Sequence, residues 1–107
     1  LQDQVFDVVW AGQRQPGSDG KLPAVGNTVD LGTATYRNVI GASQLATVWE
    51  DPNFDPTVPA LYYARVIEIP TPRWSTYDAV RAGLPLLENV AATIQERAWS
   101  SPIWYKP

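Results

Sequence analysis

Hydrophobic and polar residues alternate in several short stretches of the chain, with the spacing of half-buried β-strands. Three such stretches lie in the first half, at residues 4–11, 28–36 and 44–50. The first stretch places Phe6 and Trp10 on one face. We therefore expect a strand in each of the three stretches.

The second half carries the clearest strand signal, at residues 61–69. A second aromatic-rich block, TIQERAWSSPIWY, ends in a further predicted strand at residues 100–105. Residues 70–93 between them are longer than an ordinary loop and are predicted to be an insertion between the last two strands.

Two short helices are also predicted. The first covers residues 76–82, with Ser75 as its N-cap and Gly83 at its end. The second covers residues 91–97. Both are too short to change the mainly β character of the pattern.

Composition supports a single small domain. A chain of 107 residues, 45% of them hydrophobic, is expected to bury roughly two thirds of its unfolded surface. Ten prolines and seven glycines favour short strands and punctuated loops. The fold class predicted for residues 1–107 is mainly β: an incomplete antiparallel β-sandwich of the immunoglobulin type with an inserted loop.

Charge and residue usage exclude several functions. The net charge is −3 and the eight basic residues are scattered, whereas nucleic-acid binding needs clustered Lys or Arg. No stretch approaches the roughly 20 apolar residues of a membrane span. The chain has no Cys and no His, so it offers neither a disulfide scaffold nor the usual nucleophile–base pairs. We expect no cofactor and no catalysis from these residues.

One acidic loop resembles the beginning of a calcium site. Asp51, Asn53 and Asp55 have the spacing of the first three ligands in a calcium loop. However, Pro56 stands where that loop requires Gly, and Tyr62 stands where the closing carboxylate belongs. These three residues are weak metal candidates, and a turn rich in Asp and Pro is the favoured interpretation.

Charged residues on the predicted strands suggest a structural ion pair. Arg65 shares a strand face with apolar residues, and a buried guanidinium needs an acceptor. Glu68 and Glu96 are the candidate partners, and such a pair is favoured over contact with a substrate.

The sequence IPTPRW contains two prolines that stiffen the chain before Arg73 and Trp74. Arg and Trp are enriched at interface hot spots. Together with Tyr77 and Asp78, they are candidates for an interface or for the mouth of a neighbouring site. A packed crossover inside the domain is an equally open interpretation.

The chain is rich in aromatic residues, with five Trp, five Tyr and two Phe. Flat rings suit the stacking of sugars, but filling a small core is the favoured role. The candidates for a sugar-binding face are Trp49, Tyr63, Trp74, Trp99 and Trp104.

Several strings together resemble the carboxyl-terminal part of a bacterial family known as domain of unknown function 3604. They are FDVVWAG, GKLPAVGNTVDL, DPNFDP, YYARVIEIPTPRW and QERAWSSPIWY. The resemblance implies an upstream domain similar to metal-dependent hydrolases of the polymerase-and-histidinol-phosphatase type. It also implies a strand before Leu1 that pairs with residues 4–11. No catalytic ligand is carried over, because the matching strings contain none, and a periplasmic or exported setting is implied without being fixed.

These observations lead us to expect a piece of a larger protein, since the chain begins at Leu1 and contains no Met. Its expected role is a non-catalytic accessory domain that covers or buttresses its own upstream catalytic-type domain. Two alternatives are a carbohydrate-binding module and an oligomerisation module that forms a homodimer through a bare sheet edge.

Overall fold

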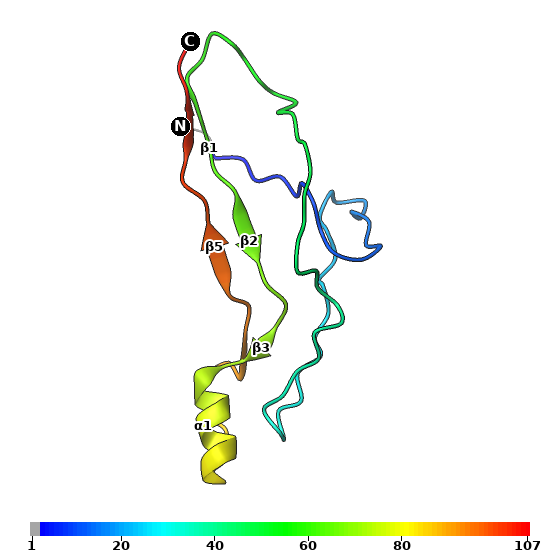
Figure 1. The fold of residues 1–107 in the computed structure, drawn as a ribbon, viewed down its shortest axis with the longest axis vertical. Coiled ribbons are helices and arrows are strands. Elements are labelled where there is room, and N and C mark those ends of the chain that lie inside the picture. The colour runs from blue at the N-terminus through cyan, green and yellow to red at the C-terminus, as the bar shows by residue number, and fades with distance from the viewer. Residues whose placement is uncertain (1–2) are drawn as a thin grey trace.

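The computed structural model describes residues 3–107, which form an elongated molecule (Figure 1). Its principal extents are 60 × 27 × 26 Å and its radius of gyration is 18.3 Å. A compact domain of this length has a radius of gyration of about 13 Å. The chain is therefore spread along a line instead of being gathered around one centre.

A long antiparallel ribbon forms the spine of the molecule (Figure 1). It consists of three two-stranded ladders in succession, which are β1 (Ala60–Tyr62) with β6 (Ile103–Tyr105), β2 (Arg65–Ile67) with β5 (Arg97–Trp99), and β3 (Thr71–Pro72) with β4 (Thr93–Ile94). The mainly β prediction is confirmed in the form of small antiparallel sheets with one helix. The β-sandwich is not confirmed.

The single strand expected at residues 61–69 is divided into β1 and β2. Between the two ladders, two residues on one side of the ribbon face three on the other, residues 100–102. Ser100 adapts to this bulge, because its N–H donates to Ala64 O and its Oγ accepts from Ala64 N, both at 2.9 Å. Pro102 has no N–H to donate, so the ladder cannot run through this point.

The helix α1 (Trp74–Ala82) occupies the tip of the ribbon. It begins two residues before the predicted start, and its N-cap is Arg73 instead of Ser75. The reason is that Arg73 is extended (φ −69°, ψ 155°) and its carbonyl already accepts from Thr76 N at 2.9 Å. The predicted end is confirmed: Gly83 adopts the left-handed conformation (φ 65°).

The segment 70–93 continues the ribbon and ends in a helical tip. Arg73 N donates to Ala92 O at 2.9 Å, which adds one step to the β3–β4 ladder. Thr76 is only 2% exposed, and its Oγ1 donates to the same Ala92 carbonyl at 2.7 Å. The helix predicted for residues 91–97 is wrong, because these residues supply β4 and the start of β5 to the ribbon.

Residues 3–59 contain no helix and no extended strand, so the strands predicted at 4–11, 28–36 and 44–50 are not formed there. Within these residues, regular pairing is limited to one antiparallel bridge between Asp30 and Thr35. A strand needs a neighbour to bond with, and these stretches find none in this half of the chain.

The buried core is very small. Among the described residues, the buried hydrophobic side chains are those of Ala34 and Ala79. The accessible surface is 8815 Å², whereas a compact protein of this mass exposes about 5,900 Å² and its unfolded chain about 17,000 Å². The chain thus buries about half of its unfolded surface. The expectation of two thirds is wrong, because the ribbon has almost nothing packed against it.

Candidate functional site

The candidate site is a groove of about 370 Å³ where the ribbon meets α1. Aromatic and charged side chains dominate its lining, namely Tyr36, Glu68, Arg73, Trp74, Tyr77 and Glu96. Five of these six residues come from the ribbon and α1, and Tyr36 comes from the irregular first half. The groove is therefore closed on one side by a segment more than thirty residues away in sequence.

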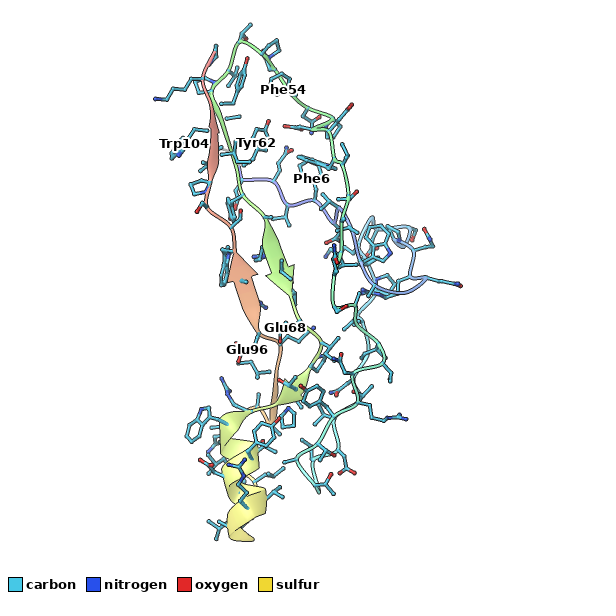
Figure 2. The ribbon with its side chains drawn as sticks, in the orientation of Figure 1. Phe6, Phe54, Tyr62, Glu68, Glu96 and Trp104 are labelled. Atoms are coloured by element: carbon cyan, nitrogen blue, oxygen red, sulfur yellow. The ribbon has the colours of Figure 1, made fainter. Side chains whose placement is uncertain are left out.

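The ribbon backbone places the two glutamates of the groove opposite each other, with Glu68 directly after β2 and Glu96 directly before β5. Glu68 N donates to Glu96 O at 2.9 Å, and Glu68 O accepts from Gln95 Nε2 at 2.9 Å. Both residues are exposed, and these hydrogen bonds leave the two carboxylates to face solvent. Figure 2 shows both residues between the β2–β5 ladder and the β3–β4 ladder.

Arg73 and the aromatic residues are held by the start of α1. Arg73 is fixed by its ladder bond to Ala92, and Trp74 and Tyr77 follow in the first turn of the helix. Trp74 is 72% exposed, whereas Tyr77 is half-buried. The guanidinium carbon of Arg81 lies 5.9 Å from the centre of the Tyr77 ring, so one cation already contacts that ring.

The structure gathers most of the predicted interface candidates at this groove. Arg73, Trp74 and Tyr77 line it, whereas Asp78 is exposed beside it and is not part of the lining. Tyr36 was not anticipated, because no local pattern connects a tyrosine in an irregular loop with the start of a helix 38 residues later.

Arg65 lies on β2 opposite Trp99 and is exposed. The argument for an ion pair assumed a buried guanidinium, and water can solvate an exposed one. Glu68 and Glu96 instead belong to the groove. The proposed pairing of Arg65 with them stays a prediction.

The acidic loop forms two consecutive turns stabilised by its own carboxylates. Asp51 Oδ1 accepts from Asn53 N and Asp51 Oδ2 accepts from the Tyr62 hydroxyl, both at 2.8 Å. Asp55 Oδ1 accepts from Thr57 N at 2.8 Å and from Thr57 Oγ1 at 2.7 Å. Within residues 3–107, no group of three acidic side chains is arranged to hold a metal ion.

These hydrogen bonds shift two pKa values. The Thr57 hydroxyl, with the Thr57 N–H, lowers the pKa of Asp55 below its ordinary value of 3.8. The hydrogen bond to Asp51 raises the pKa of Tyr62 above its ordinary value of 10.0. Both shifts are those of structural hydrogen bonds in a folded turn.

Aromatic rings join this loop to the upper part of the ribbon. Trp49 lies 5.0 Å from Phe6 and 6.4 Å from Tyr62, and Phe54 lies 5.0 Å from Tyr105, measured between ring centres. Figure 2 shows Tyr62 directed toward the coil that carries Phe6, and Trp104 directed away from it. Trp49 therefore packs within the chain.

The remaining tryptophan candidates for sugar binding are exposed on the ribbon. Trp104 is 67% exposed and lies opposite Leu61, and Trp99 is 59% exposed and lies opposite Arg65. Tyr63 is also exposed. The core-filling role expected for the aromatic residues does not apply to these three side chains.

A second cavity, of about 360 Å³, lies in the first half of the chain. Its polar side chain is Arg14, whose Nη1 donates to Pro23 O at 2.7 Å and whose Nε donates to Ala11 O at 3.2 Å. The Trp10 Nε1 donates in turn to Arg14 O at 2.8 Å. This guanidinium holds the loop together, so the cavity is a structural one.

The family comparison covers the whole chain. Residues 1–107 match the family described as Protein of unknown function (DUF3604), and the chain belongs to that family. The search of curated proteins gives no match, and neither does the search of solved structures. No helix among the described residues has both the length and the apolar character needed to cross a membrane.

Proposed function

We propose that this chain is a non-catalytic β-rich accessory domain at the carboxyl-terminal end of a larger bacterial protein. Its partner would be the upstream domain of the same polypeptide, of the metal-dependent hydrolase type. The observation that supports this proposal is the large surface left uncovered, on which many hydrophobic side chains are exposed. The accessible surface of 8815 Å² exceeds that of a compact protein of this mass by about 2,900 Å².

Exposed hydrophobic side chains occur in both halves of the chain, and the ribbon carries several of them. Trp104 and Leu61 form one exposed pair, and Val66, Ile67 and Trp99 are exposed further along. Val66 is paired with Ala98, whereas Ile67 and Trp99 are on the opposite face of the same ladder. That second face also carries Arg65 and Arg97, so it is mixed, whereas the Val66–Ala98 face is apolar. An antiparallel ladder with one apolar face is suited to packing that face against another layer.

The size of this surface favours a permanent neighbour. A standard interface removes about 800 Å² from each partner, and obligate interfaces are larger and more apolar. An excess of about 2,900 Å² on one side belongs to the obligate class. A covalently attached domain meets this requirement, and it would complete the β-sandwich for which the chain supplies only part of the strands.

In this arrangement the ribbon supplies the contact and α1 projects beyond it. Arg73, Trp74, Tyr77 and Asp78 would then face the mouth of the catalytic-type site. The reactive groups would come from the other domain, and this chain would supply shape and contacts.

Hydroxyl-radical footprinting of the full-length protein tests the proposal. Trp99 and Trp104 are expected to be labelled at least several-fold more slowly than in the unfolded protein, because the upstream domain covers them. Labelling as fast as that of the unfolded protein would contradict docking through the ribbon. Protection that disappears on dilution would assign the surface to a second copy of the chain.

A pair of variants at one position provides the control. Val66→Asp places a charge on the middle of the ribbon, and Val66→Thr keeps the β-branched shape without charge. If the upstream domain covers Val66, the Asp variant loses protection at Trp99 and the Thr variant retains it. Equal protection in both variants would mean that Val66 lies outside the contact.

A further inference from the structure

The groove at the start of α1 combines three aromatic rings with three planar charged groups. The rings are those of Tyr36, Trp74 and Tyr77, and the charged groups are those of Glu68, Arg73 and Glu96. Its volume of about 370 Å³ is within the range of roughly 300–1,000 Å³ typical of small-molecule sites. Trp74 is the most exposed of the three rings, so a flat apolar surface is presented directly to solvent.

This combination matches the surface of a sugar ring. A pyranose has C–H groups on its faces, which stack on aromatic rings, and hydroxyl groups around its edge. Adjacent hydroxyls pair well with planar groups that present two acceptors or a fork of donors, as carboxylates and guanidinium groups do. We propose that this groove binds a pyranose unit of a neutral glycan, with Trp74 as the stacking platform.

The local charges favour a neutral ligand. The two carboxylates of Glu68 and Glu96 are balanced by the guanidinium of Arg73 in the lining and that of Arg81 on Tyr77. An organic cation would meet Arg73, and the ring of Tyr77 already contacts Arg81. A phosphate or a carboxylate would meet two glutamates.

The geometry also assigns separate tasks to the members of the groove. Glu68 and Glu96 are connected through their backbones, so their spacing is set by the ribbon register and not by flexible loops. Tyr36 closes the groove from the other side of the chain. Trp74 provides affinity through stacking, and the two carboxylates orient the hydroxyls.

This inference extends the proposed function, because it places a glycan at the mouth of the neighbouring site. Its test is calorimetry on the full-length protein with neutral tetrasaccharides of glucose, mannose, xylose and galactose. At least one tetrasaccharide is expected to bind. Trp74→Ala should weaken that binding about tenfold or more, the equivalent of about 1.4 kcal/mol. Glu96→Gln should weaken it less, because the amide retains one acceptor.

Leu87→Ala is the control, since Leu87 is an exposed hydrophobic residue between α1 and β4 that does not line the groove. Its affinity should equal that of the unaltered protein. Hydrogen exchange of the α1 amides in Trp74→Ala should also be unchanged, which shows that the tip is folded. Binding of no tetrasaccharide, or equal losses in Trp74→Ala and Leu87→Ala, would overturn the inference.

Two further probes identify a different ligand class. Tetramethylammonium or inorganic phosphate binding in the groove while every tetrasaccharide fails would also overturn it. The footprint at Trp99 and Trp104 separates this test from that of docking. A protected ribbon without glycan binding contradicts the glycan site alone, and glycan binding with an unprotected ribbon contradicts docking alone.

Discussion

The two halves of the chain carry similar alternating patterns but form different structures. Among the described residues, 60–105 hold the strands and the helix, whereas 3–59 run as irregular coil with one isolated bridge. In the second half, each strand finds an antiparallel partner across the ribbon. In the first half, side chains supply the connections: Thr28 Oγ1 donates to Arg37 O at 2.6 Å and accepts from Arg37 N at 3.0 Å.

The comparison of the two halves shows what an alternating pattern predicts and what it does not. Alternation shows that the two sides of a segment have different surroundings, but it does not identify the segment that will bond to its backbone. Residues 61–69 have that neighbour in the block around Trp99, and residues 44–50 have none. The first half is thus stabilised by hydrogen bonds of individual side chains, whereas the second half is stabilised by backbone ladders.

The largest effect on stability is expected at the hydrogen bond that joins α1 to the ribbon. Thr76→Val preserves the shape of the side chain but removes the hydroxyl that donates to Ala92 O. Ala92 O keeps its bond from Arg73 N, so the change removes one hydrogen bond, which is worth about 0.5–1.5 kcal/mol. We expect that loss in the free energy of unfolding, measured by urea denaturation of the full-length protein.

The control for this change is Thr47→Val in the first half, because Thr47 is exposed. It should leave the free energy of unfolding unchanged. A Thr76→Val protein as stable as the Thr47→Val protein would mean that the tip is not fastened by this hydrogen bond.

A smaller effect is expected where the two halves meet. Tyr62→Phe removes the hydroxyl that donates to Asp51 and keeps the ring beside Trp49. The acidic loop should detach from the ribbon, with faster hydrogen exchange at Asn53 and Phe54 and a slightly lower melting temperature. Tyr63→Phe is the matched control and should change neither measurement.

The pH dependence of this contact has a definite sign. Because the pKa of Tyr62 is raised in the folded state, the unfolded chain loses its proton first as the pH increases. The stabilisation that the hydrogen bond from Tyr62 to Asp51 provides is complete below pH 10.0, and it is lost as the pH rises through the pKa of Tyr62 in the folded state. The stability difference between the unaltered protein and Tyr62→Phe should therefore shrink above pH 10.0.

The smallest effect is expected within the first half itself. The pKa of Asp55 is lowered because its carboxylate accepts from the Thr57 hydroxyl and N–H. Its stabilisation is present above pH 3.8 and is lost as the pH falls through the lowered pKa. Asp55→Asn should leave the melting temperature at neutral pH nearly unchanged and reduce its decline below pH 3.8. A decline as steep as that of the unaltered protein would contradict this role for Asp55.

The sequence predicted the features that depend on neighbouring residues. The end of α1 was predictable, because Gly83 directly follows the helical stretch and adopts a positive φ at no steric cost. The stiff stretch before Arg73 was predictable as well, since Thr71 precedes a proline and is extended in β3. The start of α1 was missed, because Arg73 is fixed by Ala92, nineteen residues later.

The features that depend on distant contacts were not predictable. The division of the ribbon at residues 100–102 requires knowledge of the register between two segments 36 residues apart. The groove combines residues that the sequence had placed in two separate groups, a charged pair and an interface. It also contains Tyr36, for which the local sequence offers no signal.

The hydrogen bond between Arg73 N and Ala92 O has a consequence for how the segment between these two residues can vary. The chain leaves the ribbon at Arg73 and returns at Ala92, one hydrogen-bonded step away. The register between the two sides of the ribbon, β1–β3 and β4–β6, therefore does not depend on the length of polypeptide between these two residues. Related proteins could have a longer, shorter or different segment between Arg73 and Ala92 without a change in the register of the ribbon. Such a change would alter the lining of the groove, because Trp74 and Tyr77 belong to this segment.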